Sequence, residues 1–410
     1  MSGATLISHG CRLNIAESDK IAAMLAGEDD LVVINSCAVT AEAVKTARQA
    51  IRRAKRDRPE ARIVVTGCAA EIEPETFRAM AEVSAIVPNT RKFDGGLYLL
   101  PGEGRGPVSP FDLGPGLRRG NALPTHARTF LPVQNGCDHR CTFCIIPYGR
   151  GPSRSLPAGG VIEEIRAAVD QGTKEVVLTG VDLTSYGADL PGQPSLGGLV
   201  ARILKLVPDL PRLRLSSLDP CEVDDALLDL IAHEPRLMPH VHLSLQAGDD
   251  MILKRMKRRH NRAQSVDLVA RLKALRPEIV IGADLIAGFP TEDETMFANT
   301  LALIDDCAIA FAHIFPYSPR AGTPAARMPQ VARPIIKDRA ARLREAGARR
   351  KAAWLQEQIG QVTLVLVELD GTSGHAENFA RVSLPASAPN SIVAARIAAV
   401  DGDTLLGVPA

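Results

Sequence analysis

Short apolar runs alternate with segments of helical periodicity along the first hundred residues. The apolar runs cover residues 5–8, 31–35, 63–66 and 85–87. Apolar residues recur at helical spacing over 40–58 and 74–81, as on the buried stripe of an amphipathic helix. Alternation of strands and helices predicts a doubly wound parallel sheet. We therefore expect an N-terminal α/β domain over residues 1–100.

A second, longer alternation follows. Residues 101–127 are rich in proline and glycine without a sustained period, which is typical of a linker. Six strands are then predicted, with the sequences FLPVQ, EVVLTG, RLRLSS, HVHLSLQ, IVIGADLIAGF and AFAHIFPYS. Helical segments separate them, the longest over 249–275. Six strand–helix units over 128–358 predict a partial (β/α)6 barrel, with its active site at the carboxyl ends of the strands. Short strands in 359–410 predict a small all-β module.

Composition and charge limit the possible function classes. The 410 residues are 46% hydrophobic and 23% charged, close to the average of soluble globular proteins, which excludes disorder and fibrous repeats. The 48 basic and 47 acidic residues nearly balance, so a nucleic-acid partner would need basic residues gathered on one face. The first residues do not resemble a secretory signal, and no apolar run has the ~20 residues of a membrane helix. We expect a cytoplasmic protein with no membrane partner.

Three of the eight cysteines form a C-x3-C-x2-C motif directly after the first predicted barrel strand. They are Cys137, Cys141 and Cys144, in the segment QNGCDHRCTFC. Three thiolates on one loop can hold three irons of a 4Fe–4S cluster and leave the fourth iron open, so that it can bind S-adenosylmethionine. A zinc site is the competing metal, although zinc sites usually show two separated pairs of ligands. Three reduced loop cysteines without metal are the remaining alternative.

Three further cysteines each follow a predicted strand of the N-terminal domain. Cys11, Cys37 and Cys68 close the segments ATLISHGC, LVVINSC and RIVVTGC. Because the carboxyl ends of parallel strands lie on one edge of a sheet, these residues are expected to converge and to hold a second cluster. The alternative is that they are buried structural cysteines, which are common in reduced proteins. Cys221 and Cys307 match neither set and are interpreted as structural.

With these motifs the chain resembles a known family, the radical-SAM methylthiotransferases. The matching segments are GCRLNIAES, INSCAVT, VTGC, CDHRCTFCIIPYGRGPSRS, LTGVDLTSYG, HLSLQAGDD and DLIAGFPTEDET. They cover nearly the whole chain in the family's order of a methylthiotransferase domain, a radical-SAM barrel and a TRAM domain. Only GHAENFARV is similar to the TRAM signature.

The resemblance implies insertion of a methylthio group at an unactivated carbon–hydrogen bond, carbon 2 of a modified adenosine beside a tRNA anticodon. It implies two 4Fe–4S clusters and S-adenosylmethionine as radical source and methyl donor. Cys137, Cys141 and Cys144 would hold the cluster that generates the radical. Cys11, Cys37 and Cys68 would hold an auxiliary cluster carrying the inserted sulfur. The partners implied are tRNA, an electron donor such as flavodoxin or ferredoxin, and a sulfur source.

Three branches of the family differ in substrate: isopentenyladenosine in tRNA, threonylcarbamoyladenosine in tRNA, or an aspartate of a ribosomal protein. GCRLN, IIPYGRGPSRS and LTGVDLTSYG look most like the threonylcarbamoyladenosine branch. CDHRCTFCIIP fits the ribosomal-protein branch equally well, which keeps that alternative open. A hypothesis from another class, a zinc-stabilised nucleic-acid-binding protein without catalysis, fits six strand-end cysteines poorly.

Polar residues at the other barrel strand ends are predicted to line the S-adenosylmethionine pocket. The predicted cofactor-binding residues are Gly180, Asp182, Ser216, Ser244, Gln246 and Asp284. A glycine permits close backbone approach, while hydroxyls, amides and carboxylates can bond to the amino and ribose groups of a cofactor. Each of them taken alone is explained as well by capping of the helix that follows a strand.

Basic residues near the predicted active rim are candidates for RNA contact. The candidates are Arg150, Arg154, Lys254, Arg258 and Arg259, with the basic stretch 339–351 as a further patch. Phosphate contact is favoured over a merely solvated helix face because the rest of the chain is nearly neutral.

Overall fold

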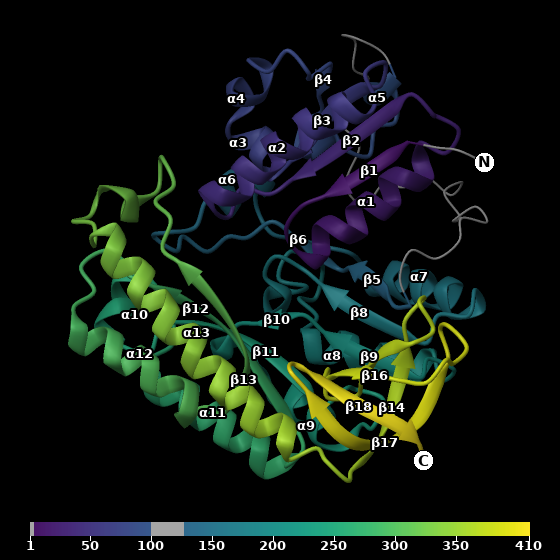
Figure 1. Ribbon diagram of the computed structural model, residues 1–410, viewed down its shortest axis with the longest axis vertical. Coiled ribbons are helices and arrows are strands. Elements are labelled where there is room, and N and C mark those ends of the chain that lie inside the picture. The colour runs from purple at the N-terminus through teal and green to yellow at the C-terminus, as the bar shows by residue number, and fades with distance from the viewer. Residues whose placement is uncertain (1–3, 100–126) are drawn as a thin grey trace. The chain divides into compact units, whose positions relative to one another are not determined.

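The computed structural model describes residues 4–99 and 127–410 (Figure 1). The predicted linker at 101–127 therefore lies almost wholly outside the described residues. The chain forms two compact units. The described part of the first comprises residues 4–99, 135–153 and 318–323; that of the second comprises 127–134, 154–317 and 324–410. The loop with Cys137, Cys141 and Cys144 thus belongs to the same unit as the N-terminal sheet.

The first unit is built on a four-stranded parallel sheet of order β1-β2-β3-β4. Its strands are β1 (Thr5–Ser8), β2 (Leu31–Ser36), β3 (Arg62–Gly67) and β4 (Ala85–Ile86). Its helices are α1 (Arg12–Met24), α2 (Ala41–Asp57), α3 (Cys68–Ile72), α4 (Pro74–Arg78), η1 (Asn89–Arg91), α5 (Gly96–Leu99) and α6 (Ile146–Arg150). Strand order follows the chain, without the reversal typical of doubly wound sheets.

Helices cover both faces of this sheet. Side chains alternate between the faces of a strand, so neighbouring residues of β2 enter different cores. Val32 and Ile34 pack with Ile51 of α2 in one core. Leu31 and Val33 pack with Ile21 of α1 in the other. Burial on both faces explains why the strands appear in the sequence as continuous apolar runs.

The second unit contains all six predicted barrel strands, and each pairing is parallel. β5 (Thr129–Pro132), β8 (Glu175–Thr179) and β9 (Arg212–Leu215) form one sheet. β10 (Ser217–Leu218), β11 (His240–Gln246), β12 (Val280–Ala287) and β13 (Ile309–Pro316) form another. The predicted third strand is therefore divided between β9 and β10 at Ser216. The short strands β6 (Gln134–Asn135) and β7 (Arg154–Ser155) flank the cysteine loop in sequence.

Helices follow the barrel strands as expected from the periodicity. They are α7 (Ala158–Asp170), η2 (Leu183–Ser185), α8 (Leu196–Leu206), η3 (Pro220–Glu222), α9 (Asp225–His233), α10 (Asp250–Met256), α11 (Arg262–Leu275), α12 (Glu294–Asp306), η4 (Pro324–Arg327) and α13 (Arg333–Gln356). The segment 249–275 is two helices, because Lys257 adopts left-handed φ of 57° and Asn261 starts α11 with a capping box. Among the described residues, no helix has the length and apolar character needed to span a bilayer.

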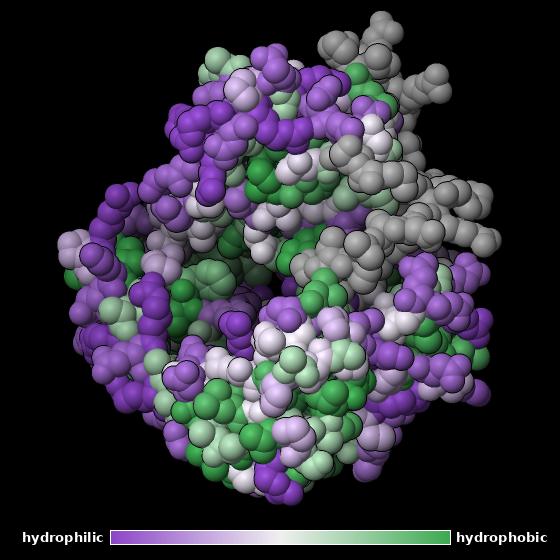
Figure 2. Space-filling model, turned by 45° about the vertical axis from the view of Figure 1, so that its right-hand side comes forward, coloured by the Kyte–Doolittle hydropathy of each residue, from purple (hydrophilic) through white to green (hydrophobic). Residues whose placement is uncertain are grey.

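The C-terminal module is a small closed β-barrel of order β14-β15-β16-β18-β17. Its strands are β14 (Val362–Val367), β15 (Ser373–Ala376), β16 (Arg381–Ser383), β17 (Ile392–Asp401) and β18 (Thr404–Pro409). Residues 359–410 hold two arginines and five acidic residues. Val362, Leu364 and Val408 are exposed, and green residues appear on the lower face in Figure 2. The module therefore has more acidic than basic residues, and part of its surface is apolar.

Candidate metal and cofactor sites

The three strand-end cysteines of the first unit lie at one edge of its sheet. Cys11 precedes α1, Cys37 follows β2, and Cys68 begins α3 directly after β3. Ser36 and Gly67 are register partners, so Cys37 and Cys68 leave neighbouring strands at the same level. Cys11 is exposed whereas Cys37 and Cys68 are buried.

Glycines allow these cysteines to approach closely. Gly10 has a φ of 102°, and a Cβ added to it would lie 2.9 Å from Cys37 Sγ. The Cys37 thiol therefore packs against the backbone next to Cys11. Gly67 has a φ of 92°, and its Cβ would lie 2.4 Å from Ser36 O. Residues with a side chain would be strained and would clash at both positions, so the two glycines permit this arrangement of thiols.

The electrostatics of these thiols favour binding of a cationic metal centre. Burial, together with the like charges of the neighbouring Cys11 and Cys68, raises the pKa of Cys37 to about 11. Burial also raises the pKa of Cys68, whereas Arg150 and Lys92 lower it. Thiolates so close together need a positive centre to remain ionised, and bound iron supplies one. The donor set therefore fits a cluster held by three thiolates.

Behind these cysteines lies a buried group of three charges, which we call the charge triad: Glu17, Lys92 and Arg150. Arg150 donates to both carboxylate oxygens of Glu17, at 2.8 and 3.1 Å. Lys92 Nζ lies 2.6 Å from Glu17 Oε1. Burial alone would raise the pKa of Glu17, but Arg150 and Lys92 outweigh it and lower it to about 2. Glu17 is therefore ionised at neutral pH.

Neutral side chains complete the hydrogen bonds of the charge triad. Arg150 donates to Asn14 Oδ1 at 2.6 Å and to Asn135 Oδ1 at 2.9 Å. Lys92 donates to Asn89 Oδ1 at 2.8 Å, and Asn89 donates to Gly149 O. Arg150 was predicted to contact RNA; its burial and these bonds contradict that role. The sequence analysis missed Glu17, although it lies in the matching segment GCRLNIAES, and Lys92, which directly follows η1 and lies in no motif.

The loop with Cys137, Cys141 and Cys144 presents three half-buried thiols before α6. Cys137 N donates to Gly151 O, and Cys144 N donates to Cys141 O, both at 3.1 Å. Gly136 has a φ of 73°, and a Cβ there would lie 1.9 Å from Pro152 O. The loop is therefore held in a tight backbone turn. Three thiols outside any disulfide within eight residues fit a 4Fe–4S cluster with one open iron.

In the second unit, Gly180 and Asp182 follow β8, and Gln134 lies against them. A Cβ on Gly180 would lie 2.9 Å from Gln134 Oε1. The same Oε1 accepts from Asp182 N at 2.8 Å, while the Asp182 carboxylate accepts from Ser185 Oγ at 2.8 Å. Gly180 thus permits close packing of Gln134, and Asp182 orients the short helix η2. Gln134 was not identified from the sequence.

Ser216, Ser244 and Gln246 occupy positions where the barrel strands are irregular. Ser216 lies between β9 and β10, and its Oγ is buried without a hydrogen-bond partner. Gln246 ends β11 after a register shift and has a φ of 67°. An unsatisfied buried hydroxyl and a left-handed non-glycine residue are both typical of binding sites. These features fit a polar ligand such as S-adenosylmethionine.

Asp284 lies in the middle of β12 between two histidines of neighbouring strands. Its Oδ1 is 3.0 Å from His242 Nε2 and 3.4 Å from His313 Nδ1. Burial opposes ionisation, but the bonds from these histidines hold the pKa of Asp284 well below its usual value. His242 and His313 were not among the predicted site residues. No sequence motif joins these residues. The pairing of neighbouring strands brings them together, with Asp284 opposite His313.

The remaining candidates for RNA contact differ in accessibility. Lys254 is exposed on α10, and Arg154 is half-buried. Arg258 donates to Asp219 Oδ2 at 2.8 Å and to Ser244 O at 2.9 Å, with only 8% of its side chain exposed. Arg259 is 40% exposed and pairs with Glu222 at 2.6 Å. The run 254–262 therefore does not form one basic face: Lys254 faces solvent, whereas Arg258 faces inward.

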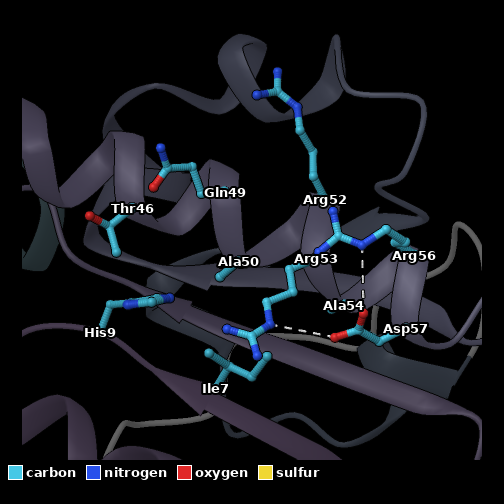
Figure 3. Close-up of a pocket in the computed structure, with 10 residues that line it drawn as sticks. All are labelled: Ile7, His9, Thr46, Gln49, Ala50, Arg52, Arg53, Ala54, Arg56 and Asp57. Carbon is cyan, nitrogen blue, oxygen red and sulfur yellow. Dashed lines mark ion pairs between the residues drawn. The ribbon is translucent and has the colours of Figure 1, made fainter.

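A separate pocket lies on the surface of the first unit, beside α2 (Figure 3). It is lined by Ile7, His9, Thr46, Gln49, Ala50, Arg52, Arg53, Ala54, Arg56 and Asp57. Asp57 pairs with Arg53 at 3.5 Å and with Arg56 at 3.7 Å. None of the six cysteines of the two candidate cluster sites lines it. These exposed pairs are screened by water, and the pocket is not part of either cysteine site.

Comparison with family models places two known sequence families on this chain. Residues 131–304 match the Radical SAM superfamily, and residues 4–88 match the Uncharacterized protein family UPF0004. Cys137, Cys141 and Cys144 fall in the first match, and Cys11, Cys37 and Cys68 fall in the second.

Several proteins of known name are similar over most of the chain. The threonylcarbamoyladenosine tRNA methylthiotransferase MtaB of Rickettsia prowazekii is 48% identical over 385 residues, which is 92% of this chain and 90% of that protein. The protein of the same name from Aquifex aeolicus is 35% identical, covering 87% and 91%. The tRNA-2-methylthio-N(6)-dimethylallyladenosine synthase of Novosphingobium aromaticivorans is also 35% identical, covering 89% and 86%.

A solved structure supports the fold. The radical S-adenosylmethionine methyltransferase TsrM from Kitasatospora setae, with tryptophan and an S-adenosylmethionine analogue bound, aligns with a TM-score of 0.52 and 18% identity. The alignment covers 73% of this chain and 64% of that one. At this identity the likeness concerns the fold alone.

Proposed function

Because the chain belongs to the radical-SAM methylthiotransferases, we propose that it methylthiolates threonylcarbamoyladenosine next to the anticodon of tRNA. The observation that carries the proposal is the 48% identity to the threonylcarbamoyladenosine enzyme over nine-tenths of its length. The three thiols at the edge of the N-terminal sheet support it, because a second cysteine set is what the sulfur-inserting chemistry needs beyond a radical-SAM barrel.

The choice of substrate rests on a difference in identity. Relatives acting on threonylcarbamoyladenosine and on dimethylallyladenosine are both found at 35%, so likeness at that level does not separate the two substrates. Of these three relatives, the one with the higher sequence identity, 48%, is a threonylcarbamoyladenosine enzyme. The dimethylallyl-type substrate is therefore the second candidate.

We propose that Cys137, Cys141 and Cys144 hold the radical-generating cluster and that Cys11, Cys37 and Cys68 hold the auxiliary cluster. When bound, these clusters and S-adenosylmethionine supply radical activation of a carbon–hydrogen bond, a sulfur atom and a methyl group. Residues 1–100, 128–358 and 359–410 would then be the methylthiotransferase, radical-SAM and TRAM-like domains. Ser216, Gln246 and Asp284 would orient the cofactor in the barrel.

The partners follow from this chemistry. Lys254, Arg154 and Arg259 are the proposed phosphate contacts, since the acidic C-terminal module offers little attraction to RNA. The reaction consumes electrons and sulfur, so a small electron carrier such as flavodoxin or ferredoxin and a sulfur source are proposed as partners. With tRNA as the substrate, we propose that the enzyme works in the cytoplasm.

The deciding experiment is nucleoside mass spectrometry of tRNA from cells with and without the gene. Loss of 2-methylthio-threonylcarbamoyladenosine with accumulation of its precursor would support the proposal. Complementation with Cys37→Ala should fail, whereas Cys221→Ala, an exposed cysteine outside both sets, should restore the nucleoside. Loss of another methylthio-adenosine would overturn the substrate alone. Unchanged tRNA would redirect the search to the ribosomal-protein aspartate.

A further inference from the structure

The charge triad has an excess of positive charge in a place that water hardly reaches. Glu17 and Arg150 side chains are each 2% exposed, and that of Lys92 is 1% exposed. Two cations share a single carboxylate, while Asn14, Asn89 and Asn135 contribute only neutral groups. Burying an unbalanced charge is costly unless a partner of opposite sign lies nearby. With both Lys92 and Arg150 protonated, an anionic neighbour would balance this surplus positive charge.

The edge of the sheet with Cys11, Cys37 and Cys68 provides that neighbour. Arg150 donates to Asn14 Oδ1 at 2.6 Å, and Cys11 Sγ lies 3.9 Å from the same oxygen. The backbone next to Arg150 packs on Cys68, since a Cβ on Gly149 would lie 3.4 Å from Cys68 Cβ. A 4Fe–4S core with two positive charges and three thiolates carries one net negative charge. One surplus cation and one net anionic charge compensate each other. The chemistry of the donor set and the charge behind it thus agree.

We infer that Glu17, Lys92 and Arg150 act as a fixed counter-charge that sets the reduction potential of the auxiliary cluster held by Cys11, Cys37 and Cys68. The inference rests on the proposed ligand set and makes these three residues positioning residues, without contact with substrate. Net charge around a cluster is one of the main determinants of its potential. Because reduction adds an electron, a nearby buried cation stabilises the reduced state and raises the potential.

Arg150 has a second role because of its place in the sequence. It ends α6, six residues after Cys144, and α6 packs directly on α3. A Cβ on Gly149 would lie 2.9 Å from Ile72 Cδ1 and 3.4 Å from Cys68 Cβ. The segment that carries the radical-SAM cysteines therefore also delivers one cation of the triad. The counter-charge is complete only when residues 135–153 are packed on the N-terminal sheet.

The test uses the full chain with Cys137→Ala, Cys141→Ala and Cys144→Ala, so that only the auxiliary cluster can form. After anaerobic reconstitution, iron and sulfide are measured, and the potential is determined by redox titration followed by electron paramagnetic resonance. Arg150→Met and Lys92→Met should each shift the potential to more negative values. Arg150→Lys keeps the positive charge, so its reduction potential should stay close to that of the parent.

Asn89→Ala is the matched control, because it removes hydrogen bonds to Lys92 and Gly149 without changing charge. Its potential should remain that of the parent. A shift in Asn89→Ala as large as in Arg150→Met, or unchanged potentials in both methionine variants, would overturn the counter-charge role. If the methionine variants hold no iron while Arg150→Lys and Asn89→Ala hold it fully, the charge is needed for assembly. A parent without iron would instead refute the ligand set.

Discussion

The guanidinium of Arg150 forms a two-pronged ion pair with the carboxylate of Glu17, 133 residues apart in sequence, at 2.8 and 3.1 Å. Paired bonds of this kind are the strongest that an arginine makes. The pair joins the segment after Cys137, Cys141 and Cys144 to α1, which begins directly after Cys11. It therefore connects the local structure around both proposed clusters within the first unit.

This pair gives a prediction about acid stability. The pKa of Glu17 is lowered from 4.5 to about 2. The stability that its ion pairs give the folded protein is therefore fully present above pH 4.5, the pKa in the unfolded chain, and is lost as the pH falls through about 2. That difference corresponds to about 3 kcal/mol. Denaturant unfolding of the metal-free protein between pH 5 and 2.5 should show a shallower pH dependence in Glu17→Gln than in the parent.

The same variant has a consequence at neutral pH. Glu17→Gln leaves Arg150 and Lys92 buried without their carboxylate, which should lower the unfolding free energy by about 3–5 kcal/mol at pH 7. Glu42→Gln is a control, because its pair with Lys45 is exposed and should be nearly neutral in effect. Equal stability of Glu17→Gln and the parent at pH 7 would contradict the ion pair.

A second prediction concerns the turn of the cysteine loop. Gly136 and Gly151 both have positive φ, 73° and 75°, but only a Cβ on Gly136 meets a neighbouring atom, Pro152 O at 1.9 Å. Gly151→Ala should cost about 1–3 kcal/mol from backbone strain and keep its iron. Gly136→Ala should prevent the loop from closing, so that reconstituted iron falls from about eight to about four per chain. Equal iron contents would show that the turn is not needed.

The sequence could predict the elements that carry the six candidate ligand cysteines but not the charges around them. Apolar runs ending in cysteine identify both the strands and the shared edge, because strand ends of a parallel sheet are placed by topology alone. Glu17, Lys92 and Arg150 lie in three separate segments, and charged residues usually face solvent. Their convergence depends on tertiary packing of α6 against α3. The assignment of Arg150 to RNA was wrong for this reason.

A similar limit applies to the basic run at 254–262. A continuous helix over 249–275 would place these residues on a solvated surface. The left-handed Lys257 ends α10 instead, and Arg258 turns back onto Asp219. A residue other than glycine at a helix C-cap gives little sequence signal. The barrel strands β8, β11 and β12 were predictable because they are almost wholly buried and rich in apolar residues, whereas β13 is partly exposed.

A third prediction concerns the histidine-flanked carboxylate. Asp284→Asn keeps the size of the side chain but removes the charge that faces His242 and His313. We expect the dissociation constant for S-adenosylmethionine to rise about tenfold, or about 1.4 kcal/mol, measured by calorimetry on the reconstituted enzyme. Asp225 is an exposed residue of α9, so the control variant Asp225→Asn should bind S-adenosylmethionine with the affinity of the parent. Unchanged affinity in Asp284→Asn would remove Asp284 from the cofactor site.

The last prediction tests where tRNA binds. Lys254 is exposed on α10, whereas Arg258 is bound to Asp219 and Ser244. Lys254→Ala should therefore weaken tRNA binding several-fold and reduce the slope of log K against log salt by about 0.7–0.9, the loss of one phosphate contact. Lys45→Ala is the control, since its ammonium already pairs with Glu42 at 3.3 Å and should contribute little. Equal losses in both variants would mean that long-range charge, and not a contact at Lys254, attracts the RNA. An unchanged salt slope in Lys254→Ala would place the phosphate contacts elsewhere on the enzyme.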